Sequence, residues 1–261
     1  MGLFTGKNGI ILGVANERSI ARGIAEVLHH EGARLGFNFL PDDRGRMEAR
    51  VKKAVSHLNP ALIHPCNVNR DEDVTAFFSA AQDALGSIDF LVHSIAFAPV
   101  EEIRKPTLAV SREGFLTAME ASVYSFIITS REATSRMGET GAILTLSYYG
   151  GEKVVEGYNL MGVAKSALDC SVKYLANELG PRNIRVNAIS AGPVKTLAAS
   201  GIGGFGKMLD YNASVAPLRR NVSTQEIGKA ASFLLSEMSS GITGEILHVD
   251  CGYNVMGAFR Y

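Results

Sequence analysis

Residues 8–30, NGIILGVANERSIARGIAEVLHH, predict the start of a nucleotide-binding fold. The apolar run at 8–13 has the composition of a buried strand and ends in Gly13, and a helical pattern follows at 19–30. A strand, a turn that contains glycine and a helix begin a βαβ unit, in which the free N–H groups of the helix start can receive a pyrophosphate. The turn lacks the G-x-G-x-x-G fingerprint, so Ser19 also fits a plain helix N-cap.

The rest of the chain continues the alternation of strands and helices without a repeat or an interdomain linker. Further strands are expected at 33–39, 61–66, 88–93, 141–147, 184–189 and 245–249, and further helices at 42–53, 70–85, 113–137, 157–179 and 224–237. We therefore predict an α/β fold, a single Rossmann-type domain over residues 1–261 with a doubly wound, mostly parallel seven-stranded sheet and helices on both faces. Residues 193–212 are rich in Gly and Ala and predict a mobile substrate-binding segment.

The composition argues against several classes of protein. The chain has 26 basic and 26 acidic residues and no long basic block, so nucleic acid and anionic membranes are not expected as partners. No targeting leader and no apolar window of bilayer length is found, and the cytoplasm is expected. Cys66, Cys170 and Cys251 are widely spaced among apolar or small residues, which predicts reduced, buried thiols and neither a disulfide framework nor a metal site.

Residues 146–165, LSYYGGEKVVEGYNLMGVAK, carry the side chains best suited to chemistry. Tyr158 and Lys165 are separated by about two helical turns, so their side chains share one face of a helix. The ammonium can orient a ribose and lower the pKa of the phenol, and the phenol can hydrogen-bond to an oxygen that gains negative charge. Taken alone, the pair fits a packing tyrosine and a solvated lysine; the surrounding chain reverses that interpretation.

The ends of two predicted strands supply candidate cofactor contacts. Asn67 and Val68 follow the third strand, where they can meet an adenine ring. The sequence HSIAFAP at 93–99 follows the fourth strand, and its small residues let a flat ring system approach the backbone. His93 stands between apolar residues and is interpreted as a hydrogen-bonded core histidine.

The residues at the end of the second strand leave the choice between NADH and NADPH open. An acidic residue near its end often binds the adenosine ribose, but Leu40 and Pro41 stand at that place. Arg44 follows shortly after and can meet a 2′-phosphate instead.

Together these motifs resemble the short-chain dehydrogenase/reductase superfamily and, within it, the bacterial NADH-dependent enoyl-[acyl-carrier-protein] reductases of type II fatty acid synthesis. The resemblance covers nearly the whole chain and rests on GVANERSIARGIA, HSIAFAP, LSYYG, the Tyr158-x6-Lys165 spacing and NAISAGPVKTLAASGI, in this order. Ketone reductases of the superfamily carry Y-x-x-x-K, whereas here Met161 stands four residues before Lys165. A phenol one turn further away suits a substrate whose reacting carbon lies beyond its carbonyl, as in a conjugated enoyl thioester.

The resemblance implies a role for individual residues. Tyr158 would hydrogen-bond to the thioester carbonyl oxygen, Lys165 would bind the nicotinamide ribose, and Tyr148 would line the substrate pocket. The implied catalytic residues are Tyr148, Tyr158 and Lys165, and no metal is implied. The implied cofactor contacts are Gly13, Ser19, Ile20, Asn67, Val68, Ser94, Ile95, Lys165, Val194 and Thr196. The implied substrate contacts are Ala96, Tyr148, Tyr158, Met161, Ile202 and Phe205. The last three, with Met208, are candidates for an acyl channel, and core or lid packing is their alternative. Asn67 and Leu40 depart from the family, which usually has Asp and often Gln there.

The implied reaction is the NAD(P)H-dependent reduction of the trans-2 double bond of an enoyl thioester carried on acyl carrier protein. NADH is the implied cofactor, NADPH stays open, and a homotetramer is implied. Docking of the acidic carrier protein on Lys195, Lys207, Arg219 and Arg220 is one interpretation of these cations, and plain surface charge is the other. Two alternative functions remain: a ketone reductase of the same superfamily, and a non-catalytic regulator that binds a dinucleotide.

Overall fold

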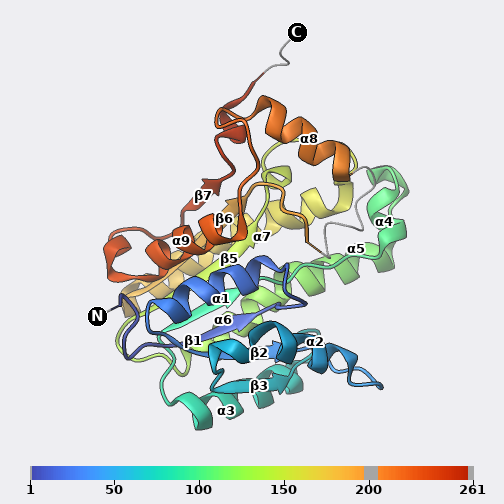
Figure 1. Ribbon diagram of the computed structural model, residues 1–261. Helices are drawn as coiled ribbons and strands as arrows, with labels where there is room; N and C mark the ends of the chain where they lie inside the picture. The colour runs from blue at the N-terminus through green and yellow to red at the C-terminus, as the bar shows by residue number, and fades with distance from the viewer. Residues whose placement is uncertain (1, 197–204, 258–261) are drawn as a thin grey trace.

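Parallel strands form one central sheet in the computed structural model, which describes residues 2–196 and 205–257 (Figure 1). The described part contains seven strands, and every neighbouring pair is parallel in the order β3-β2-β1-β4-β5-β6-β7. They are β1 (Asn8–Leu12), β2 (Arg34–Phe39), β3 (Leu62–Pro65), β4 (Phe90–His93), β5 (Gly141–Ser147), β6 (Ile184–Ala191) and β7 (Ile246–Val249). The predicted fold class is confirmed.

Helices cover both faces of the sheet, and each face has its own apolar core. One core joins the sheet to α1 (Ile20–His30), α2 (Arg46–Val55) and α9 (Thr224–Leu235), and Figure 1 shows α1 and α9 side by side. The other joins it to α3 (Asp71–Leu85), α5 (Arg112–Met119), α6 (Ser125–Thr134) and α7 (Asn159–Leu179). The central strands are apolar almost throughout because parallel strands are buried on both faces. Ile143 and Leu144 of β5 show this, since they point into opposite cores.

Three local features of the helices were not predicted. The helix expected at 113–137 is interrupted by the π-helical turn Glu120–Tyr124. The helix α4 (Val100–Arg104) was not predicted because five residues are too few to show a periodic pattern. The helix α8 (Phe205–Val215) begins inside residues 193–212, where no helix was predicted, and the mobility of that segment stays a prediction.

The cysteines are only partly as expected. Cys66 is buried and Cys251 is half-buried, but Cys170 is exposed, so the prediction of a buried thiol is wrong there. The reason is its position on the solvent face of α7, where apolar or small sequence neighbours point in other directions.

Among the described residues, no helix combines the length and apolarity needed to cross a bilayer, and no group of side chains suits a metal ion.

The strand order reverses between β1 and β4, and this reversal fixes where a ligand can bind. In open α/β sheets the crevice lies outside the carboxyl ends of the strands at this point. Gly13 follows β1 there, Ser94 follows β4, and the Ser94 N–H donates to the Leu12 carbonyl oxygen (3.1 Å). Two stretches that the sequence singled out therefore lie on either side of one crevice.

Candidate active site

Gly13 is required where the backbone of the first turn meets the end of β4. Its φ of +95° is left-handed, and a Cβ at this position would overlap the Ser94 carbonyl oxygen. The Gly13 N–H donates to Asn38 Oδ1 (3.0 Å), and Asn38 Nδ2 donates to the Cys66 carbonyl oxygen (3.3 Å). One buried amide thus holds the carboxyl ends of three strands together. The sequence interpretation missed Asn38, although a lone polar residue in an apolar strand is a usable signal.

Replacing Gly13 by alanine is expected to lower the free energy of unfolding by more than the left-handed backbone conformation alone explains. Gly6 is the matched control, because its φ is +78° and nothing lies within 4 Å of a Cβ placed there. We expect Gly6→Ala to lower the free energy of unfolding by about 1 kcal/mol, the usual cost of a left-handed alanine. Gly13→Ala should lower it by about 1–3 kcal/mol more because of the overlap with Ser94, and should also weaken NADH binding. Urea unfolding and a binding titration would measure both; equal losses in the two variants would contradict this account.

Ser19 organises the turn before α1 instead of capping the helix. It occupies the N-cap position, but its side chain makes no cap hydrogen bond. Its hydroxyl oxygen accepts from the N–H groups of Ala15 (3.0 Å) and Asn16 (3.1 Å). The alternative in which the Ser19 side chain caps the helix is therefore wrong. The first N–H groups of α1 keep no intrahelical acceptor, as at any helix start, so this end suits an anion.

Other predicted cofactor contacts lie at the carboxyl edge of the sheet. Asn67 follows β3 and is half-buried, and its side-chain oxygen already accepts from the Asn69 N–H (3.1 Å), while Val68 is buried. The remaining cofactor candidates are Ile20 at the first position of α1, half-buried Ser94 and Ile95 after β4, and half-buried Val194 and Thr196 after β6. Ala96, a predicted substrate contact, is exposed next to Ile95.

A tight turn packs against both Tyr158 and Lys165. The short helix η4 (Tyr149–Gly151) joins β5 to the segment before α7. A Cβ on Gly150 would overlap the Tyr158 ring, and one on Gly151 would lie 3.1 Å from Lys165 Cβ. Two successive glycines thus pack on the two side chains, Gly150 on Tyr158 and Gly151 on Lys165. The shared helix face that their spacing predicted stays a prediction. Tyr158 itself precedes α7, of which it is the N-cap residue.

Tyr148 packs against Tyr158 and reaches α8. The two ring centroids are 4.8 Å apart in an edge-to-face arrangement, and the Tyr148 hydroxyl lies 3.6 Å from Met208 Sδ. Burial raises the pKa of Tyr148 to about 12, and burial is also the main cause that raises the pKa of Tyr158, followed by Tyr148 and Asp169. The sequence led us to expect that Lys165 lowers the pKa of the Tyr158 phenol, whereas in this structure burial raises it and Lys165 is not among the groups that act on it. Both phenols keep their protons at neutral pH and can donate hydrogen bonds.

Lys165 is an almost fully buried ammonium. Its exposed fraction is 5%, and Nζ donates to the Leu146 carbonyl oxygen at the end of β5 (2.6 Å). Burial lowers the pKa of Lys165 to about 8, and the Asp169 carboxylate acts in the opposite direction. The charge of this side chain therefore changes just above neutral pH.

His93 is a core residue, as the sequence indicated. It is fully buried, with Nδ1 3.1 Å from Thr145 Oγ1 and Nε2 2.9 Å from Ser125 Oγ. Burial, with a smaller effect of Lys165, lowers the pKa of His93 to about 3. The imidazole is neutral at physiological pH and uses both nitrogens inside the core.

The structure describes the side chains of only some candidates for the acyl channel. Met161 is buried in the core that contains α7, which is what its packing alternative expects. Ile202 lies outside the described residues. Phe205 begins α8, but its side chain is not among the described ones.

Asn159 anchors the start of α7 and was missed by the sequence interpretation. Its φ is +30°, and Nδ2 donates to the carbonyl oxygens of Ile103 (3.2 Å) and Lys105 (2.8 Å). Asn tolerates left-handed backbone better than most residues, so an Asn directly after the phenol was an available signal. The contact ties the segment around α4 to the end of α7 that carries Tyr158.

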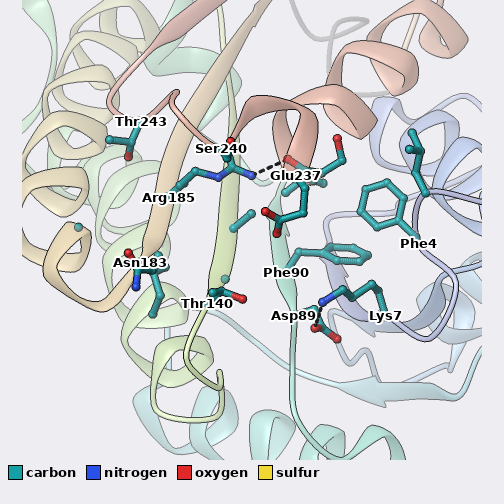
Figure 2. A pocket seen from close by; sticks show the side chains of 17 residues that line it. Phe4, Lys7, Asp89, Phe90, Thr140, Asn183, Arg185, Glu237, Ser240 and Thr243 are labelled. Carbon is teal, nitrogen blue, oxygen red and sulfur yellow. Dashed lines mark hydrogen bonds and ion pairs between the residues drawn. The ribbon is translucent and has the colours of Figure 1, made fainter.

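A cavity of about 340 Å³ lies at the opposite ends of the strands, where β1, β4, β5 and β6 begin (Figure 2). Its polar groups are bonded within the protein: Lys7 pairs with Asp89 (2.9 Å), and Arg185 donates to the carbonyl oxygens of Leu234 (2.7 Å) and Ser236 (3.0 Å). We assign it no part in the chemistry, because it lies away from the crevice at the carboxyl ends.

Comparisons with known proteins agree with the geometry. A family model described as enoyl-(acyl carrier protein) reductase matches residues 13–254. An enoyl-[acyl-carrier-protein] reductase [NADH] of Nostoc sp. is 50% identical over 253 residues, which make up 97% of this chain and 98% of that relative. The crystal structure of enoyl-[acyl-carrier-protein] reductase (NADH) from Aquifex aeolicus has a TM-score of 0.95 at 47% identity and covers 99% of this chain and 100% of its own. The reductase of Anaplasma phagocytophilum in complex with NAD has a TM-score of 0.94 at 46% identity, with 100% and 98% covered.

Proposed function

This chain belongs to the enoyl-(acyl carrier protein) reductase family, and on that premise we propose that Tyr158 and Lys165 carry its reaction. The protein is an NADH-dependent enoyl-[acyl-carrier-protein] reductase of fatty acid synthesis. The observation that supports the assignment is that a buried phenol and a buried ammonium pack against successive glycines of η4, Gly150 and Gly151, after the carboxyl end of β5.

The residues of the crevice fit a dinucleotide. Gly13 leaves no room for a side chain where its backbone meets β4, and the start of α1 offers N–H groups to a pyrophosphate. Lys165 Nζ, at the end of β5, would bind the nicotinamide ribose. The other proposed contacts are those expected from the sequence: Ser19, Ile20, Asn67, Val68, Ser94, Ile95, Val194 and Thr196.

When bound, NADH supplies the hydride that reduces the β-carbon of the enoyl thioester. The thioester carbonyl then becomes an enolate oxygen, and the Tyr158 O–H donates a hydrogen bond to it. The high pKa of Tyr158 favours this role, since the group stays a neutral donor. A proton reaches the α-carbon to complete the saturated thioester. Tyr148 and Ala96 would line the substrate pocket beside this oxygen.

One assay tests the proposal against the ketone reductase alternative. NADH and NADPH oxidation would be measured with a trans-2-enoyl thioester and, in parallel, with a 3-ketoacyl thioester. NADH oxidation that depends on the enoyl substrate is expected. Oxidation with the ketoacyl substrate alone would overturn the proposal, and cofactor binding without turnover of either would favour a regulator.

We also propose that acyl carrier protein docks on Lys195 and Lys207, which are both exposed. Arg220 is less available, because it already pairs with Glu226 through two hydrogen bonds (2.6 and 2.9 Å). The double variant Lys195→Glu/Lys207→Glu is expected to raise KM for an enoyl carrier-protein substrate about tenfold by charge repulsion, with little effect on a small enoyl thioester. Exposed Lys229→Glu on α9 is the control for the charge change. Equal effects on both substrates would exclude this docking surface.

The expected homotetramer and single domain are part of the same proposal. The solvent face of α7 presents Val163, Cys170 and Tyr174, spaced at helical intervals, and the adjoining helices present Phe115, Leu116, Tyr124 and Ile127. An apolar face of this kind suits contact with a second copy of the chain. Light scattering would give the oligomeric state. The substrate-binding role of residues 193–212 and the cytoplasmic location stay proposals as well.

A further inference from the structure

Asp169 is a buried carboxyl group that the proposed reaction leaves without a role. It lies four residues after Lys165 on α7, so the two side chains share one face of the helix. Its exposed fraction is 8%. A Cβ on Gly151 would lie 2.9 Å from Asp169 Oδ2 and 3.1 Å from Lys165 Cβ, so the carboxylate and the lysine stem meet under the same glycine.

The surroundings of Asp169 act on its charge in opposite directions, and burial has the largest effect. Burial raises the pKa of Asp169, while Ser147, Lys165 and Lys173 lower it. Asp169 also lines a pocket of about 440 Å³ together with Glu152, Lys173 and Glu245. A charged carboxylate here stabilises an ammonium that its own burial disfavours.

Other titratable groups surround the pair on the neighbouring elements. His93 on β4 is held neutral by burial, and Tyr158 keeps its proton. Glu152 lies 2.7 Å from His248 of β7 and raises the pKa of Asp169, and Lys173 is exposed on α7. Within the described part of the chain, Asp169 is the carboxylate whose charge acts on Lys165.

We propose that Asp169 is a positioning residue that keeps Lys165 protonated, so that the enzyme binds NADH at and above neutral pH. The inference rests on the proposed function, in which the Lys165 ammonium binds the nicotinamide ribose. It adds a second requirement for that role, because a buried lysine needs a partner to carry its charge.

The test is the pH dependence of NADH affinity, measured by titration from about pH 6 to about pH 9, a range that spans the charge change of Lys165. Wild-type affinity is expected to fall above about pH 8, where Lys165 loses its proton. In Asp169→Asn the same fall should begin about one pH unit lower, so that affinity matches wild type near pH 6 and is about tenfold weaker above pH 8. Asp169→Glu, which keeps the carboxylate, should restore the wild-type profile.

Controls separate this role from a structural one. Glu178→Gln makes the same change of charge at an exposed position of α7 and should leave the profile unchanged. Lys165→Arg should remove the fall above pH 8, because arginine stays charged; this comparison does not need a folded Asp169→Asn. His248→Gln should keep the wild-type midpoint.

Four outcomes would overturn the inference. The first is a wild-type midpoint in Asp169→Asn, and the second is an equal loss of affinity at every pH, which indicates a structural role. The third is a fall that persists in Lys165→Arg, and the fourth is a midpoint that moves in His248→Gln. Absence of NADH binding by the wild-type protein would be distinct from all four, since it overturns the proposed function together with the inference.

Discussion

Tyr158→Phe is expected to lower kcat with an enoyl thioester by about two to three orders of magnitude while leaving NADH affinity unchanged. The substitution removes one hydroxyl group and keeps the ring that packs against Gly150 and Tyr148. The loss corresponds to about 2.7–4 kcal/mol, the usual effect of one oxyanion donor in a site that excludes water. Tyr158 is 9% exposed, so water cannot readily replace the missing donor. Steady-state kinetics and a separate NADH titration would measure the two quantities.

Two variants sharpen this test. Tyr174→Phe removes the same group from an exposed position of α7 and should leave kcat unchanged. Tyr148→Phe removes the neighbouring phenol, whose hydroxyl faces Met208. If Tyr148→Phe lost activity while Tyr158→Phe kept it, the enolate oxygen would be bound by Tyr148 and the assigned roles would be reversed.

The sequence predicted the strands and turns that form the site because these elements depend on local patterns. Short apolar runs separated by helical patterns indicated the parallel strands, and such strands place their carboxyl ends at one edge. Gly13 and residues 93–99 could therefore be assigned to one crevice. The long helix that carries Lys165 was predictable from its own pattern, whereas the start of α7 one residue after Tyr158 was not.

Features that depend on packing could not be predicted. The direction of the Tyr158 pKa depends on how completely other elements bury the phenol. Its neighbour Tyr148 contacts Met208 of α8, which is 60 residues away in sequence. Asn38 and Asn159 act through bonds to distant backbone groups, which their sequence neighbours do not show. Asp169 was in principle visible as a helical neighbour of Lys165, but an acidic residue four positions after a lysine is usually a solvated surface pair.

Lys165→Met is expected to raise the Kd for NADH by about 10- to 100-fold, because hydrogen bonds to a charged group are worth about 1.5–3 kcal/mol. Methionine keeps an unbranched apolar side chain of similar length, so the contact with Gly151 and the packing of α7 can persist. Lys173→Met makes the same change two turns further along the helix at an exposed position and should leave NADH affinity unchanged.

The same variant also separates function from stability. Burial lowers the pKa of Lys165, which means that the folded state holds this charge at an energetic disadvantage. Removing the charge should therefore leave the free energy of unfolding unchanged or raise it near neutral pH, provided that Asp169 takes up a proton. An unchanged Kd would contradict the role of Lys165 in cofactor binding. A weaker Kd with an equal or higher stability would instead show that the buried ammonium is present for the cofactor and not for the fold.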